Sequence, residues 1–257
     1  MNDANPNLPA PPPIPPLTGQ SPRSSAPGDD PAERETIPSG VSAIECILRQ
    51  PRRVMFQLRQ PGAGRLITAM LFLAVLCSLI YGAVVGSFSG GVQWWAAPVK
   101  IATGLLISAL ICLPSLYIFA CLSGSQARLA EIFGLVCGLL LLMTVLLIGF
   151  APVAWLFSQS TASLAWMGTL HLVFWGIATA FGLRFLETGF SHTQARTVAG
   201  LRTWVVIFLL VALQMTTALR PLVGTADSFL PQEKKFFLTH WGDCLKMPKF
   251  DSREYRR

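Results

Sequence analysis

Five long apolar segments indicate whether most of this chain folds in water or in a lipid bilayer. A transmembrane helix needs roughly 20 apolar residues to cross about 30 Å of hydrocarbon. Charged residues within the segments, such as Lys100, Glu131 and Arg184, stand near segment ends, where long side chains can reach an interface. The sequence therefore predicts an all-α polytopic membrane bundle of about five transmembrane helices. The predicted spans are residues 66–88, 97–123, 129–157, 164–187 and 203–222.

The low content of charged residues supports the same conclusion. Charged residues make up 13% of the chain and hydrophobic residues 52%, whereas a soluble domain usually carries about a quarter charged residues. The net charge of +7 comes largely from arginines near the ends of the apolar segments, without a long basic run. This pattern is typical of topology signals rather than of nucleic-acid binding. Membrane lipids are therefore expected partners, and nucleic acid is not.

The distribution of arginines predicts the orientation of the bundle. The loops predicted on the outer side, residues 89–96 and 158–163, carry no charge. Basic residues gather instead in segments that face the cytoplasm if the N-terminus is inside. They are Arg49, Arg52, Arg53, Arg59, Arg65, Arg128, Arg184, Arg196 and Arg202. We expect a multi-pass protein of the bacterial cytoplasmic (inner) membrane, with a cytoplasmic N-terminus and a periplasmic C-terminus.

Two polar regions precede the predicted bundle. Residues 1–43 contain eleven of the nineteen prolines and are predicted to form a disordered cytoplasmic tail. We interpret this tail as a flexible tether, or alternatively as a ligand for a proline-binding groove. Residues 44–65 form a basic segment that Pro51 divides. With Arg52 and Arg53 available for phosphates, this segment is interpreted as an interfacial helix on the anionic leaflet, or as a cluster that only sets topology.

A second polar tail, residues 225–257, follows the last predicted span. A short amphipathic helix is expected to start at Pro231, because proline is favoured in the first turn of a helix. Arg220 marks the outer end of the fifth span. We interpret it as an interfacial anchor for lipid, with a clamp on the outer tail through Asp227 or Glu233 as the alternative.

Small residues recur every four positions in three of the spans. Such spacing lets another helix approach closely. The residues are Ser78, Gly82 and Gly86 in the first span, Gly134 and Gly138 in the third, and Gly176 and Ala180 in the fourth. Packing within the bundle is the simpler interpretation. The alternative is contact with another membrane protein or with a second copy of the chain.

Several other residues in the spans have structural interpretations. His171 lies well inside a span, and we interpret it as hydrogen-bonded and structural, because a proton relay needs charged partners. Pro114 and Pro152 predict kinks in the second and third spans. Tryptophans are predicted to form an aromatic belt at the interfaces. They are Trp94, Trp95, Trp155, Trp166 and Trp204.

The sequence contains no familiar catalytic or metal-binding motif. The patterns HExxH, GxSxG and the Walker loop are missing. The six cysteines form neither a CxxC pair nor a cluster with histidine. We therefore predict no catalytic residue, no cofactor and no metal, in a protein that is not an enzyme.

Four stretches are similar to an uncharacterised family of polytopic inner-membrane proteins from bacteria. They are residues 47–58, 81–91 (YGAVVGSFSGG), 100–119 with the core ICLPSLY, and 214–224 (QMTTALRPLVG). More distantly, a basic helix ahead of five spans resembles the architecture of the Yip1 family. Yip1 proteins have a cytoplasmic N-terminus and are linked in eukaryotes to vesicle trafficking. The resemblance implies a membrane fold and brings no assigned activity or site residue.

These features favour a non-catalytic membrane scaffold or assembly partner. Its tail and basic segment would face the cytoplasm, and its small-residue faces would contact other helices. The alternative is a permease or transporter subunit for a neutral or apolar solute, which needs no buried charge. A cavity that reaches the middle of the membrane would favour transport. A filled core with an exposed glycine groove would favour assembly.

Overall fold

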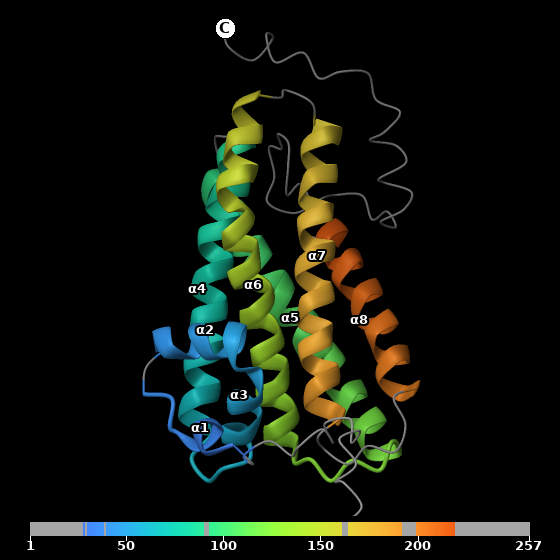
Figure 1. Cartoon of the computed structure of the whole chain (residues 1–257). Helices are drawn as coiled ribbons and strands as arrows, with labels where there is room; N and C mark the ends of the chain where they lie inside the picture. Colours follow the sequence, from blue (N-terminus) through green and yellow to red (C-terminus); the bar gives the residue numbers. More distant parts are fainter. Residues whose placement is uncertain are drawn as a thin grey trace, which may run out of the picture.

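The computed structural model describes residues 28, 30–38, 40–89, 93–160, 164–191 and 199–218. All regular secondary structure in these ranges is helical, which confirms the all-α prediction for them. Figure 1 shows α4 to α8 running along a common direction, with α1 to α3 gathered toward one end. The helices are α1 (Pro31–Arg34), α2 (Gly40–Arg49), α3 (Pro51–Leu58), α4 (Gly64–Ser89), α5 (Gln93–Leu122), α6 (Leu129–Ser160), α7 (Leu164–Ser191) and α8 (Ala199–Ala218).

Helices α4 to α7 are long and apolar enough to cross a membrane. The qualifying stretches are Gly64–Ser87, Trp94–Leu122, Leu129–Ser160 and Trp166–Phe190. The apolar part of α8, Thr203–Met215, is shorter. The described residues therefore indicate a multi-pass membrane protein with 4 clear spans, where the sequence predicted five. The end of the predicted fifth span, after residue 218, lies outside the described residues.

Helix α6 forms the centre of the bundle. Its most apolar stretch is 72% buried, whereas those of α4, α5 and α7 are 39%, 33% and 39% buried. Helices α4 and α7 both pack along α6, and α8 packs on α5. Glu131 is the one charged residue of α6 and stands in its first turn. The rest of the helix carries no charge and can therefore be buried without the cost of desolvating one.

A glycine brings α4 and α5 into backbone contact. A Cβ atom added at Gly82 would overlap with the Cα atom of Pro98 and would lie 2.9 Å from the Pro98 nitrogen. Only glycine allows this approach, because backbone atoms cannot move aside as a side chain can. The level of Gly82 and Pro98 is therefore a fixed crossing point of the two helices.

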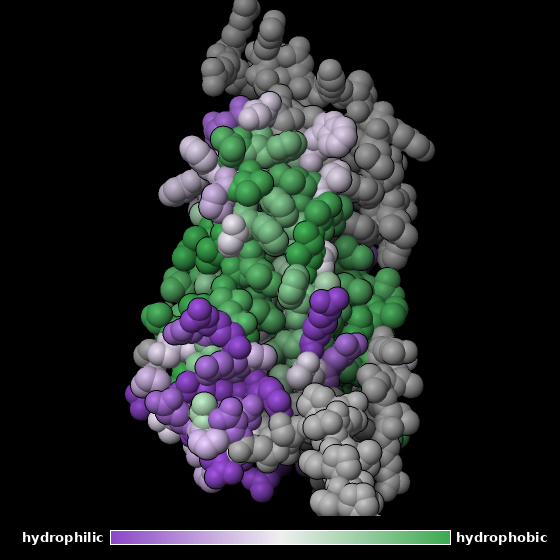
Figure 2. All heavy atoms as spheres, viewed as in Figure 1, coloured by the Kyte–Doolittle hydropathy of each residue, from purple (hydrophilic) through white to green (hydrophobic). Residues whose placement is uncertain are grey.

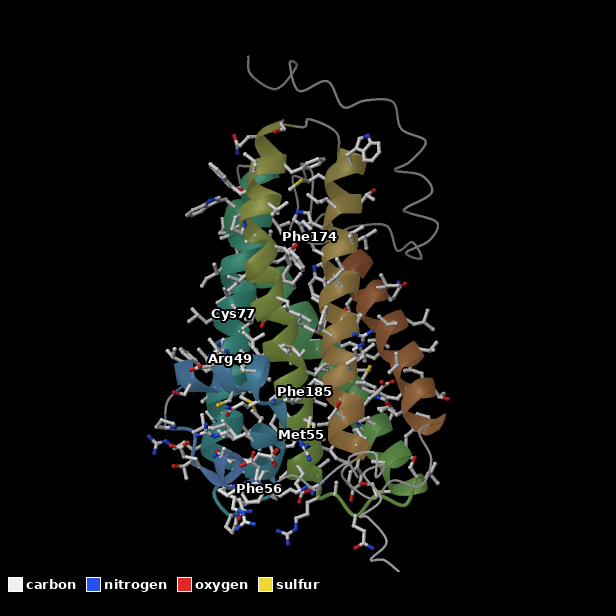
Figure 3. The ribbon with its side chains drawn as sticks, viewed as in Figure 1. Arg49, Met55, Phe56, Cys77, Phe174 and Phe185 are labelled. Carbon is white, nitrogen blue, oxygen red and sulfur yellow. The ribbon has the colours of Figure 1, made fainter. Side chains whose placement is uncertain are left out.

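Helices α6 and α7 meet through a glycine contact and a pair of stacked aromatic rings. The Phe185 ring on α7 lies 2.8 Å from the position that a Cβ of Gly138 would take. Phe150 of α6 and Phe174 of α7 stack with ring centroids 4.7 Å apart. Figure 3 shows Phe174 and Phe185 at different heights along α7. The contact therefore extends along much of both helices.

Trp204 fastens α8 to α5. Its Nε1 atom donates to the Cys112 carbonyl at 2.8 Å, and its ring stacks on Phe208 with centroids 5.2 Å apart. Trp204 is fully buried, so its prediction as part of the interfacial belt is wrong. The hydrogen bond explains the difference, because it satisfies the indole N–H inside the bundle. The more exposed tryptophans are Trp94, Trp95, Trp155 and Trp166.

Helices α1 to α3 are here called the collar (residues 30–58); α2 contacts α4 and α6, α3 contacts α6 and α7, and α1 packs on α3. The predicted break at Pro51 agrees with the structure, since α2 ends before it and α3 begins at it. The predicted tail of residues 1–43 overlaps the collar, because α1 and α2 start before its end. Asp30 accounts for the early start, since its side chain accepts the Ala32 N–H at 3.0 Å and caps α1.

The apolar face of α3 packs against the bundle. Val54, Met55 and Leu58 are all buried, in the segment interpreted above as an interfacial helix or as a cluster that only sets topology. Leu58 occupies the space beside Gly134, where a Cβ atom would lie 2.5 Å from its Cδ2 atom. Because Gly134 has no side chain, α6 can accept the collar side chain at this position. The collar is thus part of the folded core rather than a free interfacial helix.

The surface divides into an apolar band and a polar end. Figure 2 shows hydrophobic side chains across the middle of the visible face and hydrophilic ones over the collar. Each long helix exposes large apolar side chains, which is costly in water and favourable in lipid. Examples are Phe72, Leu110, Leu156, Phe181 and Leu210.

Candidate functional site

A buried polar pair joins α4 to α7. The Tyr81 hydroxyl and the Nδ1 atom of His171 are 2.7 Å apart, and the two rings meet edge to face with centroids 5.7 Å apart. Tyr81 is fully buried and His171 is 7% exposed. Tyr81 lies about 26 Å along α4 from Gly64, which is near the far side of a hydrocarbon core. The geometry is that of a hydrogen-bonded histidine close to the membrane surface opposite the collar.

The Nε2 atom of His171 is buried and has no hydrogen-bond partner among the described residues. When the Tyr81 hydroxyl donates to Nδ1, the neutral imidazole carries its proton on Nε2. The pair therefore presents a buried N–H donor away from water. Such a donor lowers stability unless another polar atom accepts its hydrogen bond.

Lys100 lies deeper in the bundle than the sequence predicts. It is 1% exposed, whereas the sequence predicts a side chain that reaches the interface. Helix α5 begins at Gln93 rather than at residue 97, so Lys100 lies about 10 Å from the start of the helix.

The second candidate region is the collar, where an acidic segment lies on α3. We call residues 30–37 the strap. Arg53 donates from Nε to the Glu35 carbonyl at 2.9 Å and from Nη2 to the Thr36 carbonyl at 3.1 Å. Gln57 donates to the same Glu35 carbonyl and accepts the Ile37 N–H at 3.2 Å. The α3 side chains thus bind the strap backbone as they would bind an extended peptide.

Two ion pairs also join the strap to α3. Arg52 Nε lies 3.3 Å from Glu33 Oε1, and Arg53 Nη2 lies 3.4 Å from Glu35 Oε2. The Glu33 carboxylate also accepts the Gly28 N–H at 2.6 Å. In this structure the arginines predicted to contact lipid phosphates therefore contact carboxylates of the same chain. Their role as lipid anchors stays a prediction.

Cys46 of α2 lies beside this network and is 5% exposed. Burial raises the pKa of the Cys46 thiol, while the positive charge of Arg53 opposes the increase and Glu45 and Glu35 add to it. The result is a thiol that stays protonated at neutral pH. Cys46 therefore acts as a small apolar side chain of the collar rather than as a nucleophile.

The predicted helix-packing residues are covered within the bundle. Gly82 meets the backbone of α5, and Gly134 and Gly138 meet side chains of the collar and of α7. Ser78 is 2% exposed and Gly86 is buried. These small residues therefore serve contacts inside one chain in the described structure.

Another small-residue pair faces outward. Gly176 and Ala180 of α7 are exposed, and a Cβ atom at Gly176 would meet no atom within 4 Å. The same holds for Gly149 of α6. Because Phe150 stacks on Phe174, Gly149 and Gly176 lie at a similar height along the bundle. We call Gly149, Gly176 and Ala180 the outward small residues.

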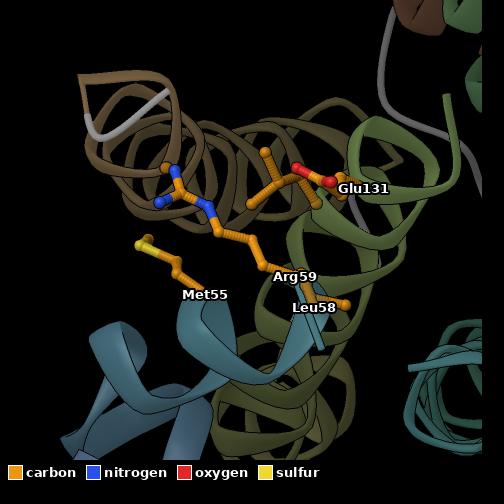
Figure 4. A pocket seen from close by; sticks show the side chains of 6 residues that line it. Met55, Leu58, Arg59 and Glu131 are labelled. Carbon is orange, nitrogen blue, oxygen red and sulfur yellow. The ribbon is translucent and has the colours of Figure 1, made fainter. Parts of the chain in front are cut away.

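A small hollow lies where α3 meets α6 and α7 (Figure 4). It has room for about one water molecule, so it is too small for an organic ligand. Its lining residues are Met55, Leu58, Arg59, Glu131, Leu135 and Gly189.

Comparisons with known proteins add no assignment to these features. No family model, curated protein or solved structure matches the chain. Within the described ranges, no three His, Cys, Asp or Glu side chains come close enough to hold a metal ion. The predictions for Arg220, Asp227, Glu233 and the helix in residues 225–257 concern positions outside the described residues.

Sequence reasoning missed two parts of these sites. Tyr81 carries no local signal, because its partner His171 is 90 residues away in the chain. The strap does carry a local sequence signal for a helix start, although the surrounding prolines favour disorder. Asp30 precedes Pro31, and an acidic residue follows in the first turn. This combination is typical of a helix start and would have moved the end of the predicted tail.

Proposed function

We propose that the chain is a non-catalytic membrane scaffold that binds another transmembrane helix through α7. The outward position of Gly176 and Ala180 carries this proposal. Gly82 and Gly138 are covered by neighbouring atoms of the same chain, so their capacity for close packing is already used. Gly176 leaves backbone exposed at a level where another helix can approach, and small residues at this spacing favour such contacts.

The filled centre of the bundle supports a scaffold. Leu139, Leu141 and Leu147 of α6 are fully buried, and α4 and α7 cover this helix from different sides. A densely packed central helix holds its neighbours in one arrangement. The outer surface of α7 is then presented at a fixed angle, which favours recognition of a partner helix.

We predict that a photo-crosslinking amino acid at Ile177 captures a discrete protein partner in native membranes. Ile177 is 39% exposed and adjoins Gly176. Gly176→Leu should reduce the crosslink at least about fivefold, because the added side chain prevents close approach. The products are measured by mass spectrometry of the crosslinked bands.

The matched control places the same crosslinker at Phe72 of α4, which is 67% exposed and is followed along the exposed face by Leu76 and Ile80. Lipid adducts alone are expected there. Equal protein capture from both positions, or none from Ile177, would count against α7 as the contact surface.

The buried His171 favours a second function, that of a permease subunit for a neutral solute. Its Nε2 atom has no partner in the described residues and could bind a carbonyl or hydroxyl oxygen of the solute. A neutral solute needs no buried charge to balance it. The Tyr81 and His171 variants in the Discussion separate this function from a structural role.

We further infer a five-span topology in a bacterial cytoplasmic membrane, with the N-terminus inside and the C-terminus outside. The 20 residues of α8 would cover about 30 Å, and its contact with α5 keeps it in the bundle. The arginines of the collar support a cytoplasmic collar. The order of a basic helical region followed by long apolar helices supports the resemblance to the bacterial family and to the Yip1 architecture.

Alkaline phosphatase fused after Phe250 is expected to be active, because this enzyme folds only outside the cytoplasm. A fusion after Ser125, between α5 and α6, should be inactive at equal expression, since this loop would face the cytoplasm. Inactive enzyme at Phe250 in an intact protein would indicate an even number of spans. The measurement is phosphatase activity normalised to immunoblot signal.

A further inference from the structure

We propose that Arg52 and Arg53 bind the phosphate groups of anionic lipids and that the strap occupies this site when such lipids are scarce. The strap would then act as an internal competitor that covers the basic face of α3. This inference goes beyond the scaffold function and does not depend on it. It requires only that the apolar band of the bundle lies in a bilayer.

The charges on the two sides of this contact are opposite. The strap carries Asp30, Glu33 and Glu35 against a single basic residue, Arg34. Between residues 40 and 65 the balance is reversed, with Glu45 as the one acidic residue. The basic residues in that range are Arg49, Arg52, Arg53, Arg59 and Arg65. A strap of this charge therefore covers a surface that attracts anions when it is exposed.

The geometry of the contact suits phosphate as well as carboxylate. The Arg53 guanidinium donates to the Glu35 and Thr36 carbonyls and lies 3.4 Å from the Glu35 carboxylate. The planar fork of arginine binds carboxylate and phosphate oxygens in the same bidentate arrangement. Arg52 Nε lies 3.3 Å from the Glu33 carboxylate, an ion pair without hydrogen-bond geometry at this atom. Glu33 and Glu35 thus stand where the oxygens of a lipid phosphate would bind.

The position of the collar places these arginines at the level of the headgroups. Leu58 of α3 packs on Gly134, near the start of α6. Figure 2 shows the hydrophilic surface of the collar next to the apolar band. The side chain of Arg52 is 35% exposed and can reach outward on its flexible stem. A phosphate in the adjacent leaflet is therefore within reach of this face.

The strap is held weakly enough for lipid to displace it. Its helix α1 has only 4 residues and none of them is buried, and Ile37 is its partly buried apolar contact with the core. The Glu35 side chain is 74% exposed, so its ion pair contributes little to stability, and the less exposed pair is that of Glu33, whose side chain is 16% exposed. The binding free energy that an arginine gains near an anionic membrane surface is comparable to that of an exposed ion pair. The two states are therefore close in free energy, and lipid composition decides between them.

The test uses the full-length protein in nanodiscs of phosphatidylcholine, with or without about one-third phosphatidylglycerol. Hydrogen exchange of the peptide covering residues 30–37 reports strap release, because the Ile37 N–H is bonded to Gln57 in the docked state. We expect anionic lipid to speed this exchange roughly threefold to tenfold. Equal exchange in both bilayers would overturn the proposal.

Charge-neutralised variants separate competition from a general effect of the surface. Glu33→Gln combined with Glu35→Gln should exchange rapidly in both bilayers and retain about threefold more phosphatidylglycerol in native mass spectrometry. Arg52→Gln combined with Arg53→Gln should retain less than wild type. The control is Glu45→Gln, which removes a carboxylate from the exposed pair with Arg49 and should behave as wild type. Unchanged lipid retention in the first variant would refute the competition.

A final arm distinguishes lipid from free anions. Inorganic phosphate at the concentration of the lipid phosphate is added to the phosphatidylcholine nanodiscs. We expect no change in strap exchange, because a free anion lacks the high local concentration of a membrane surface. Release by inorganic phosphate alone would assign the site to soluble phosphates and overturn the lipid assignment.

Discussion

Replacing Gly82 with alanine is expected to lower the free energy of unfolding by about 2 kcal/mol. Alanine gains about 0.5–1 kcal/mol over glycine within a helix, whereas forcing atoms into a packed interface typically costs about 1–3 kcal/mol. At Gly82 the added methyl group would overlap with the Pro98 backbone, which no rotamer change relieves. The upper part of the steric range therefore applies, and α4 and α5 must separate.

The matched substitution is Gly176→Ala, where a Cβ atom would meet nothing within 4 Å. Only the gain in helix propensity remains, so stability should stay equal or rise by up to about 1 kcal/mol. Both variants are compared with wild type by denaturant unfolding in mixed micelles, followed by tryptophan fluorescence. If the two variants are equally stable, the close backbone contact of α4 with α5 is absent in the protein.

Replacing Tyr81 with phenylalanine should destabilise the bundle by about 1–2 kcal/mol. The change removes the hydroxyl 2.7 Å from His171 Nδ1 and leaves both ring nitrogens of a buried histidine without a partner among the described residues. Hydrogen bonds in membrane bundles often contribute less than about 1 kcal/mol. An unsatisfied buried polar group costs about 1–3 kcal/mol, which places this variant above that average.

Adding His171→Leu to Tyr81→Phe is expected to recover stability to within about 1 kcal/mol of wild type, because both polar partners are then apolar. The unfolding free energies of the single and double variants give the coupling energy of the pair. The double variant also tests function through the Ile177 crosslink. Unchanged capture of the partner supports a structural pair, whereas loss of capture or of solute uptake in a stable double variant assigns the pair a functional role.

The collar shows where local sequence patterns were sufficient and where they were not. The break at Pro51 was predictable, because proline cannot continue the preceding helix and α3 starts at this residue. Val54, Met55 and Leu58 stand at helical spacing, and all three are buried on one face of α3. What covers that face was not predictable, because lipid and the glycine-lined surface of α6 are both apolar and suit the same pattern.

The same distinction holds for the arginine pair of the collar and for Trp204. Arg52 and Arg53 were identifiable from charge alone, as a basic pair ahead of an apolar span. Their contacts with Glu33 and Glu35 were not, because a proline-rich composition predicts disorder for the whole region. The position of Trp204 in the sequence likewise indicates an interfacial residue. In the structure its N–H donates to the Cys112 carbonyl, which is 92 residues away in the chain.

The sequence by itself determined the helical class and the lipid solvent of this protein. The hydropathy and the length of each apolar segment can be read from the local sequence. A backbone in hydrocarbon must satisfy its hydrogen bonds within its own helix. Only the tertiary structure decided that α6 is central, that Gly82 is covered while Gly176 is open, and that the strap lies on α3. In an apolar solvent every face of a transmembrane helix is equally compatible with lipid. The hydrophobic pattern therefore does not determine which helices pack together, and contacts between residues distant in the chain do.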